Sequence, residues 1–183
     1  ATTFVENRLS AVHPINISLR SDQYEIFKSP KALNAIESLT QFLNTIEEVD
    51  KITSVNDYIK DINQSLHNEA PAFYKIPATK QNVAQYLLLY GRDDLDDFVD
   101  SRWQWTTIRV RLKEHSTIRL KKVIQKIEQY LHDHADELPG AEVLGQTVLE
   151  AETNNSVTEG QVKSLLLAMV IIFCMIFLVF QSV

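Results

Sequence analysis

An uninterrupted apolar run near the C-terminus constrains this chain more than any other feature. From Leu165 to Phe180 the sequence has no polar side chain, and Lys163 stands just before the run. At about 1.5 Å per residue, a helix over 164–183 would be about 30 Å long, which matches the hydrocarbon core of a bilayer. A helix that is apolar on every side suits lipid better than water, so we predict a transmembrane helix over 161–183.

Two other interpretations of the run stay open. A helix buried in a soluble core would need the preceding part of the chain to enclose it on every side. The other is a lipid-anchor signal, because Asn154-Asn155-Ser156, a short spacer and an apolar tail fit its loose pattern. A secretory signal peptide is excluded, since such a peptide stands at the N-terminus.

The composition excludes several classes of function. The chain has 18 Lys and Arg against 24 Asp and Glu, a net charge of −6, so it lacks the excess of positive charge that nucleic-acid binding requires. The single cysteine, Cys174, lies inside the apolar run, which leaves the remainder without disulfides, thiolate metal sites or cysteine catalysis. With four glycines and no catalytic motif, the sequence gives no sign of an enzyme, and we expect no cofactor.

The part before the run alternates between strand and helix patterns. Ile15, Ile17 and Leu19 alternate with polar residues, which predicts a strand over 14–20. A helix capped by Ser29 should follow and end near Val49. The same reasoning predicts, in order, a strand over 51–55, helices over 55–67 and 78–90, a strand over 103–114, a helix over 116–135 and a strand over 141–149.

This order predicts an α+β fold of the ferredoxin-like class. Strand, helix, strand, insertion, strand, helix, strand is the split β-α-β arrangement, in which two helices pack on one face of an antiparallel sheet. We therefore expect an α+β domain over 1–160, with a helical insertion at about 56–100, followed by the membrane helix at 161–183.

Two polar clusters resemble metal sites, but their spacing argues against binding. His132 and His134 are two residues apart on a predicted helix, so their rings point about 200° away from each other and cannot share an ion. The acidic residues between Asp93 and Asp100 lack the alternating spacing and the glycine of a calcium loop. We interpret both clusters as solvated surface and predict no metal site.

The predicted strand over 103–114 carries the candidate binding residues. Its apolar face should hold Ile108, Val110 and Leu112, and its polar face should hold Thr107, Arg109, Arg111 and Lys113. Trp103 and Trp105 are two residues apart, so both should face one side of this strand. They could form an aromatic wall of an apolar binding cleft, or they could simply pack at a sheet edge.

A family resemblance extends over about residues 14–183. The chain resembles the first extracytoplasmic porter domain and second transmembrane helix of RND-superfamily exporters, particularly the MMPL-like branch. The segments that carry the likeness are INISLR, SPKALNAIESLTQFLNTIEEV, VDKITSVNDYIKDINQSL, IPATKQNVAQYLLLY, TTIRVRLKEHS and QVKSLLLAMVIIFCMIFLVFQS. The segment EVLGQTVLEAE matches the last strand of such domains only loosely.

The resemblance implies a role in proton-driven efflux. The domain would lie on the extracytoplasmic side of a bacterial inner membrane and form one wall of a passage for hydrophobic or amphipathic small molecules or lipids, with Trp103 and Trp105 as candidate lining residues. No ionisable residue lies between Leu165 and Phe180, so proton relay would belong to other helices.

The partners that the resemblance implies are the lipid bilayer and the remainder of the transporter chain. Further copies of the chain are an open alternative. Because the chain starts at Ala1 and stops soon after Gln181, we expect a segment of a longer membrane protein. The alternatives are a single-pass, membrane-anchored binding or scaffolding module and a membrane-tethered enzyme.

Overall fold

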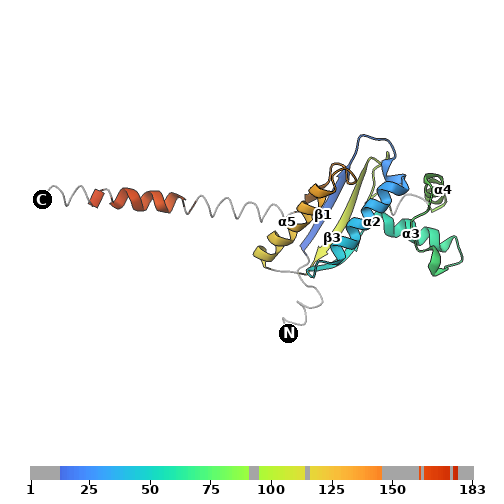
Figure 1. Cartoon of the computed structure of the whole chain (residues 1–183), viewed down its shortest axis with the longest axis horizontal. Helices are drawn as coiled ribbons and strands as arrows, with labels where there is room; N and C mark the ends of the chain where they lie inside the picture. Colours follow the sequence, from blue (N-terminus) through green and yellow to red (C-terminus); the bar gives the residue numbers. More distant parts are fainter. Residues whose placement is uncertain are drawn as a thin grey trace, which may run out of the picture. The chain divides into compact units, whose positions relative to one another are not determined.

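The protein is α+β in the part of the chain that its structure describes. The computed structural model describes residues 13–90, 95–113, 116–145, 161, 163–173 and 175–176 (Figure 1). The chain divides into two compact units, residues 1–148 and residues 149–183. All described strands belong to the first unit, and the described part of the second unit is helical.

One antiparallel sheet organises the first unit. Its strands stand in the order β2-β3-β1-β4, so the two central strands, β1 and β3, are far apart in sequence. Every neighbouring pair is antiparallel. The strands are β1 (His13–Arg20), β2 (Val49–Thr53), β3 (Trp105–Leu112) and β4 (Glu142–Leu144).

The central pair divides the sheet into a buried and an open face. Ile15 lies opposite Val110 and Ile17 opposite Ile108, and all four are at most 1% exposed. Residues of the alternate positions, such as Arg109, are exposed on the other face. The predicted faces of β3 are therefore confirmed. Thr107 lies on the open face, as predicted, but is buried there, with 7% of its surface exposed.

Two helices cover the buried face, α2 (Pro30–Asn44) and α5 (Thr117–Asp133). Figure 1 shows both helices lying across β1 and β3. Ser29 caps α2, because its side chain accepts a hydrogen bond from the Ala32 amide at 3.3 Å. The inner residues of the two helices join the same core as the strands: Leu33, Ile36, Leu39 and Leu43 from α2, and Leu120, Val123, Ile124, Ile127 and Leu131 from α5.

A helical insertion separates β2 from β3. It contains α3 (Val55–Ser65), a short 3-10 turn at Pro71–Phe73 and α4 (Lys80–Tyr90). Ile59 of α3 and Val83 of α4 belong to the same core as the sheet residues. The insertion is thus packed onto the domain and is not a separate unit.

The second unit contains an apolar helix over the described residues 161, 163–173 and 175–176. Leu165 lies in this helix, whereas Cys174 and residues 177–183, including Phe180, lie outside the described residues. Within the described part of the chain, no helix is both long enough and apolar enough to cross a membrane.

Most predicted elements are confirmed, but several boundaries are wrong. Strand β2 covers Val49–Thr53 and not 51–55, because Ser54 caps the helix that follows. Helix α2 ends at Asn44, earlier than predicted, because a turn follows in which the Val49 amide bonds to the Ile46 carbonyl at 3.0 Å before β2 begins. Strand β3 begins at Trp105, since Trp103 has a left-handed backbone with φ of 54°. Strand β4 is shorter than predicted, and residues 146–149 lie outside the described part.

The two faces of β3 predict opposite tolerance to a new charge. Val110→Asp would place a carboxylate at a position that is 1% exposed, with an expected cost of several kcal/mol in the free energy of unfolding. Arg109→Asp changes a half-exposed side chain and should cost about 1 kcal/mol or less. Urea unfolding of both variants measures the difference; equal losses would contradict the assignment of faces.

The turn before β4 predicts a second stability effect. Gly140 has φ of +56°, and a Cβ atom there would lie 2.5 Å from the Arg20 carbonyl oxygen. Gly140→Ala should therefore lower the free energy of unfolding by about 1–3 kcal/mol. The control is Ala141→Ser, at the next position in the chain; a Gly140→Ala chain as stable as this control would show that the turn is not strained.

Candidate functional site

Trp103 does not lie where the sequence places it. It precedes β3, is 4% exposed and belongs to the core. Its amide donates to the Asp100 carbonyl at 3.1 Å, and the Lys28 ammonium lies 5.5 Å from its ring centre. The prediction that Trp103 and Trp105 share one face of a strand is wrong, because it assumed an extended backbone through a residue that the structure places in a tight loop.

Asp100 holds this loop together. Its Oδ1 accepts hydrogen bonds from the amides of Gln104 at 2.7 Å and Trp105 at 2.9 Å. Partial burial raises the pKa of Asp100, but these amide bonds and a further one from Arg102 outweigh burial, so its pKa lies below the ordinary value. Asp100 is thus a structural carboxylate at the start of β3.

The other predicted polar clusters serve local contacts. Asp97 pairs with Arg109 at 3.1 Å, while Asp93 and Asp94 lie outside the described residues. The His134 ring stacks on Tyr130 at 4.0 Å, and its Nδ1 lies 2.9 Å from the Tyr130 carbonyl oxygen. Over the described ranges, no group of three or more His, Cys, Asp or Glu residues could hold a metal ion.

Trp105 lies on the open face of the sheet at the edge of a surface hollow. Its indole Nε1 donates to the Ser18 hydroxyl of β1 at 2.7 Å, so the ring bridges the two central strands. A hollow of about 500 Å³ lies beside it, which we call the Trp105 hollow. The residues that define its chemistry are Ser18, Arg20, Asp22, Trp105, Glu142 and Leu144.

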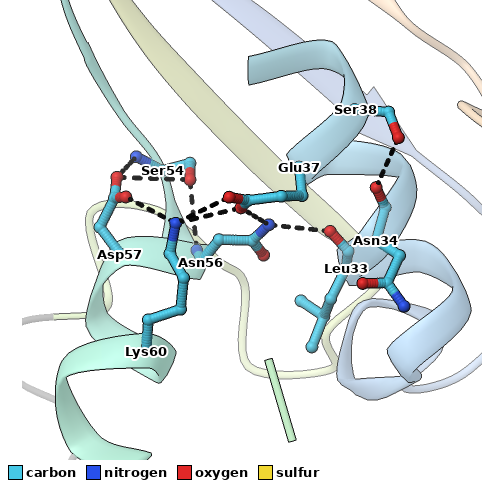
Figure 2. Close-up of polar contacts among 8 residues, drawn as sticks. All are labelled: Leu33, Asn34, Glu37, Ser38, Ser54, Asn56, Asp57 and Lys60. Atoms are coloured by element: carbon cyan, nitrogen blue, oxygen red, sulfur yellow. Dashed lines mark hydrogen bonds and ion pairs between the residues drawn. The ribbon is translucent and has the colours of Figure 1, made fainter. Parts of the chain in front are cut away.

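A second polar site, the Lys60 cluster, joins α2 to α3 and comprises Glu37, Asn56, Asp57 and Lys60. Figure 2 shows Lys60 and Asn56 pointing from α3 toward Glu37 of α2. The Lys60 ammonium donates to both carboxylate oxygens of Glu37, at 3.0 and 3.1 Å, and lies 3.5 Å from Asp57. Asn56, which is fully buried, donates to Glu37 at 3.1 Å and to the Leu33 carbonyl at 2.8 Å.

The capping of α3 fixes Asp57 in this cluster. Ser54 is the N-cap, and its amide donates to the Asp57 carboxylate at 2.8 Å in a capping box. Asp57 is therefore held at the first turn of α3, three residues before Lys60. The cap thus sets the position of a partly buried group of charges.

The electrostatics of the cluster argue against a catalytic lysine. Burial lowers the pKa of Lys60, but the hydrogen bonds and charge of Glu37 and the charge of Asp57 outweigh it, so the pKa lies above the ordinary 10.5. A lysine nucleophile needs a lowered pKa, because only the neutral amine attacks. The Lys60 cluster is therefore a structural joint between α2 and the insertion.

Sequence reasoning missed both the Lys60 cluster and the residues around Trp105. The S-V-N-D stretch at Ser54–Asp57 has the spacing of a capping box and could have marked the start of α3. Nothing local pairs Glu37 with Lys60, which are 23 residues apart. Arg20 and Glu142 come together only through the pairing of β1 with β4.

Comparison with known proteins does not assign this chain to a family. No protein-family model matches the sequence, and a search of curated proteins finds no significant relative.

The Lys60 cluster predicts a non-additive stability effect. Lys60→Met leaves the Glu37 carboxylate without its cation and should cost about 1–3 kcal/mol, as should Glu37→Met, whereas the double variant should lose less than the sum. The control pair is Arg111 and Asp50, whose side chains are 47% and 43% exposed and should couple by less than about 1 kcal/mol. Equal coupling in the two pairs would contradict the idea that partial burial strengthens the Lys60–Glu37 pair.

The raised pKa of Lys60 also predicts a pH dependence. The stabilisation is fully present below the ordinary pKa of 10.5 and is lost as the pH rises through the raised folded value. The stability difference between the unmodified chain and Lys60→Met should therefore stay constant from about pH 7 to 9 and shrink only in stronger alkali. Urea unfolding across this range measures it; a difference that shrinks by pH 9 would contradict the pairing.

Proposed function

We propose that this chain is a porter-type extracytoplasmic domain joined to a membrane-spanning helix, in an exporter that resembles the RND superfamily and its MMPL-like branch. The observation that carries the proposal is the strand order β2-β3-β1-β4 in a domain followed by an apolar helix. The membrane would be a bacterial inner membrane, and the substrates hydrophobic or amphipathic molecules.

The strand order supports a ferredoxin-like domain. Helix α2 connects β1 to β2, and β3 lies between these two strands in the sheet. Helix α5 connects β3 to β4, and β1 lies between those two strands. Two β-α-β units are thus interleaved in one antiparallel sheet with both helices over one face, as in a split β-α-β fold. The insertion with α3 and α4 occupies the connection from β2 to β3, where the resemblance places an additional helix.

The apolar helix supports an association with lipid. Its large apolar side chains at described positions from Leu165 to Ile176 are 49–73% exposed. Exposed apolar surface on every side of a helix is unfavourable in water and favourable in hydrocarbon. We assign the bilayer as its surroundings.

The contrast between the covered and the open face of the sheet supports a role for this domain as one wall of a substrate passage. The helices bury one face, while the open face presents Trp105 beside polar and charged side chains to an amphipathic molecule. The packed core would let the domain move as a rigid body, so its part would be to shape a passage. Proton relay would lie on other helices, because the sequence from Leu165 to Phe180 has no Asp, Glu, His, Lys or Arg.

Membrane insertion is tested by extraction. The full chain, expressed in bacteria, should stay in the membrane pellet after alkaline carbonate treatment. The double variant Ile171→Asp/Ile172→Asp should be extracted, since each charge at the centre of a membrane helix costs about 2.5–3.5 kcal/mol. Ile118→Asp, at an isoleucine that is 73% exposed on α5, is the matched control and should stay in the pellet. Extraction of the unmodified chain would contradict the proposal.

The coding sequence around the chain separates an exporter from an anchored module. The proposal expects one apolar helix shortly before Ala1 and several more after Val183 in the same reading frame. A stop codon directly after Val183, together with an upstream signal peptide, would instead favour a single-pass binding or scaffolding module.

A further inference from the structure

The Trp105 hollow combines three kinds of chemistry on one side of the sheet. Arg20 and Ser18 come from β1, Trp105 from β3, and Glu142 and Leu144 from β4. β1 and β4 pair so that Ser18 lies opposite Glu142 and Asn16 opposite Leu144, which sets these side chains on the open face. A guanidinium, a carboxylate and an indole therefore surround a space of about 500 Å³.

The charged side chains of the hollow differ in their pairing from the other two arginines on the open face, Arg109 and Arg111. Arg109 pairs with Asp97 and stacks on Phe98, and Arg111 pairs with Asp50. Within the described ranges, by contrast, no hydrogen bond or ion pair engages the side chains of Arg20 or Glu142. A guanidinium and a carboxylate thus line one hollow without a partner among the described residues, which leaves both charges available to a ligand.

The indole offers a third contact of a defined kind. Because the N–H of Trp105 is already donated to Ser18, a ligand can use only the ring itself. Aromatic rings attract cations, and quaternary ammonium groups in particular. Leu144, which is 47% exposed, supplies an apolar contact at the rim.

We propose that the Trp105 hollow binds the zwitterionic head group of a phospholipid-like amphiphile. Arg20 would hold the phosphate through its guanidinium fork, while Glu142, Asp22 and the Trp105 ring would hold the ammonium. A simple anion would be repelled by the two carboxylates and a simple cation by Arg20, so a ligand with both charges fits best. The interpretation of the hollow as a site for a transported substrate rests on the proposed function. The binding of a zwitterionic head group does not depend on that function.

The test is calorimetric titration of the full chain in micelles of a nonionic detergent. The probes are glycerophosphocholine, which carries the phosphodiester of a lipid head group, and three smaller compounds: phosphocholine, choline chloride and inorganic phosphate. Glycerophosphocholine should bind with a dissociation constant at least tenfold below those of choline and phosphate. Equal or weaker binding of glycerophosphocholine would overturn the proposal. Binding of free phosphocholine without glycerophosphocholine would overturn the assignment to a lipid.

Variants locate the binding in the hollow. Arg20→Gln and Glu142→Gln should each weaken glycerophosphocholine binding at least fivefold, and Arg20→Lys should weaken it less than Arg20→Gln. The controls with the same charge changes are Lys51→Gln, near the other edge of the sheet, and Glu47→Gln, both exposed. Circular dichroism verifies that each variant is folded; equal losses in folded variants and controls would overturn the site.

The binding experiment and the carbonate extraction can fail independently of each other. A chain that resists carbonate but does not bind glycerophosphocholine keeps the proposed function and rejects the head-group site. A chain that binds the probe but is extracted by carbonate rejects the proposed function and keeps the site.

Discussion

The pairing of β1 with β3 is the contact on which the rest of the domain depends. It joins residues about 90 positions apart in continuous register from His13–Leu112 to Arg20–Trp105. This register sends the apolar residues of both strands to one face, where α2 and α5 bury them, and leaves the alternate residues on the other face. A slip of one residue would exchange the two faces and place charges such as Arg109 in the core.

The same register creates both polar sites. On the open face it sets Trp105 beside β1, where the indole reaches Ser18, and β4 then places Glu142 opposite Ser18, in the same hollow as Arg20. On the covered face, the apolar side of α2 joins the core, and Glu37 on the same helix accepts hydrogen bonds from Lys60 of the insertion. The two sites differ in their charges: Lys60 and Glu37 pair with each other, whereas Arg20 and Glu142 make no such pair among the described residues.

Local pattern was enough to predict most of the fold and little of the candidate sites. The alternation of Ile15, Ile17 and Leu19 and the cap at Ser29 were visible in the sequence because they depend on neighbours a few residues away. Trp103 was misplaced because its left-handed backbone is imposed by contacts with Asp100 and the core. The partners of Lys60 and Arg20 could not be predicted, because only the tertiary fold brings them close.

Accessibility of the single cysteine tests the central claim, an extracytoplasmic domain on a membrane helix, most directly. In intact spheroplasts, a membrane-impermeant maleimide should leave Cys174 unlabelled until the protein is denatured in detergent, because a membrane-spanning helix would hold this residue in lipid. In the same experiment, a Glu47→Cys chain should be labelled at its exposed domain position. Labelling of Cys174 as fast as the domain position would contradict the membrane helix, and a domain position that reacts only after lysis would contradict the extracytoplasmic side.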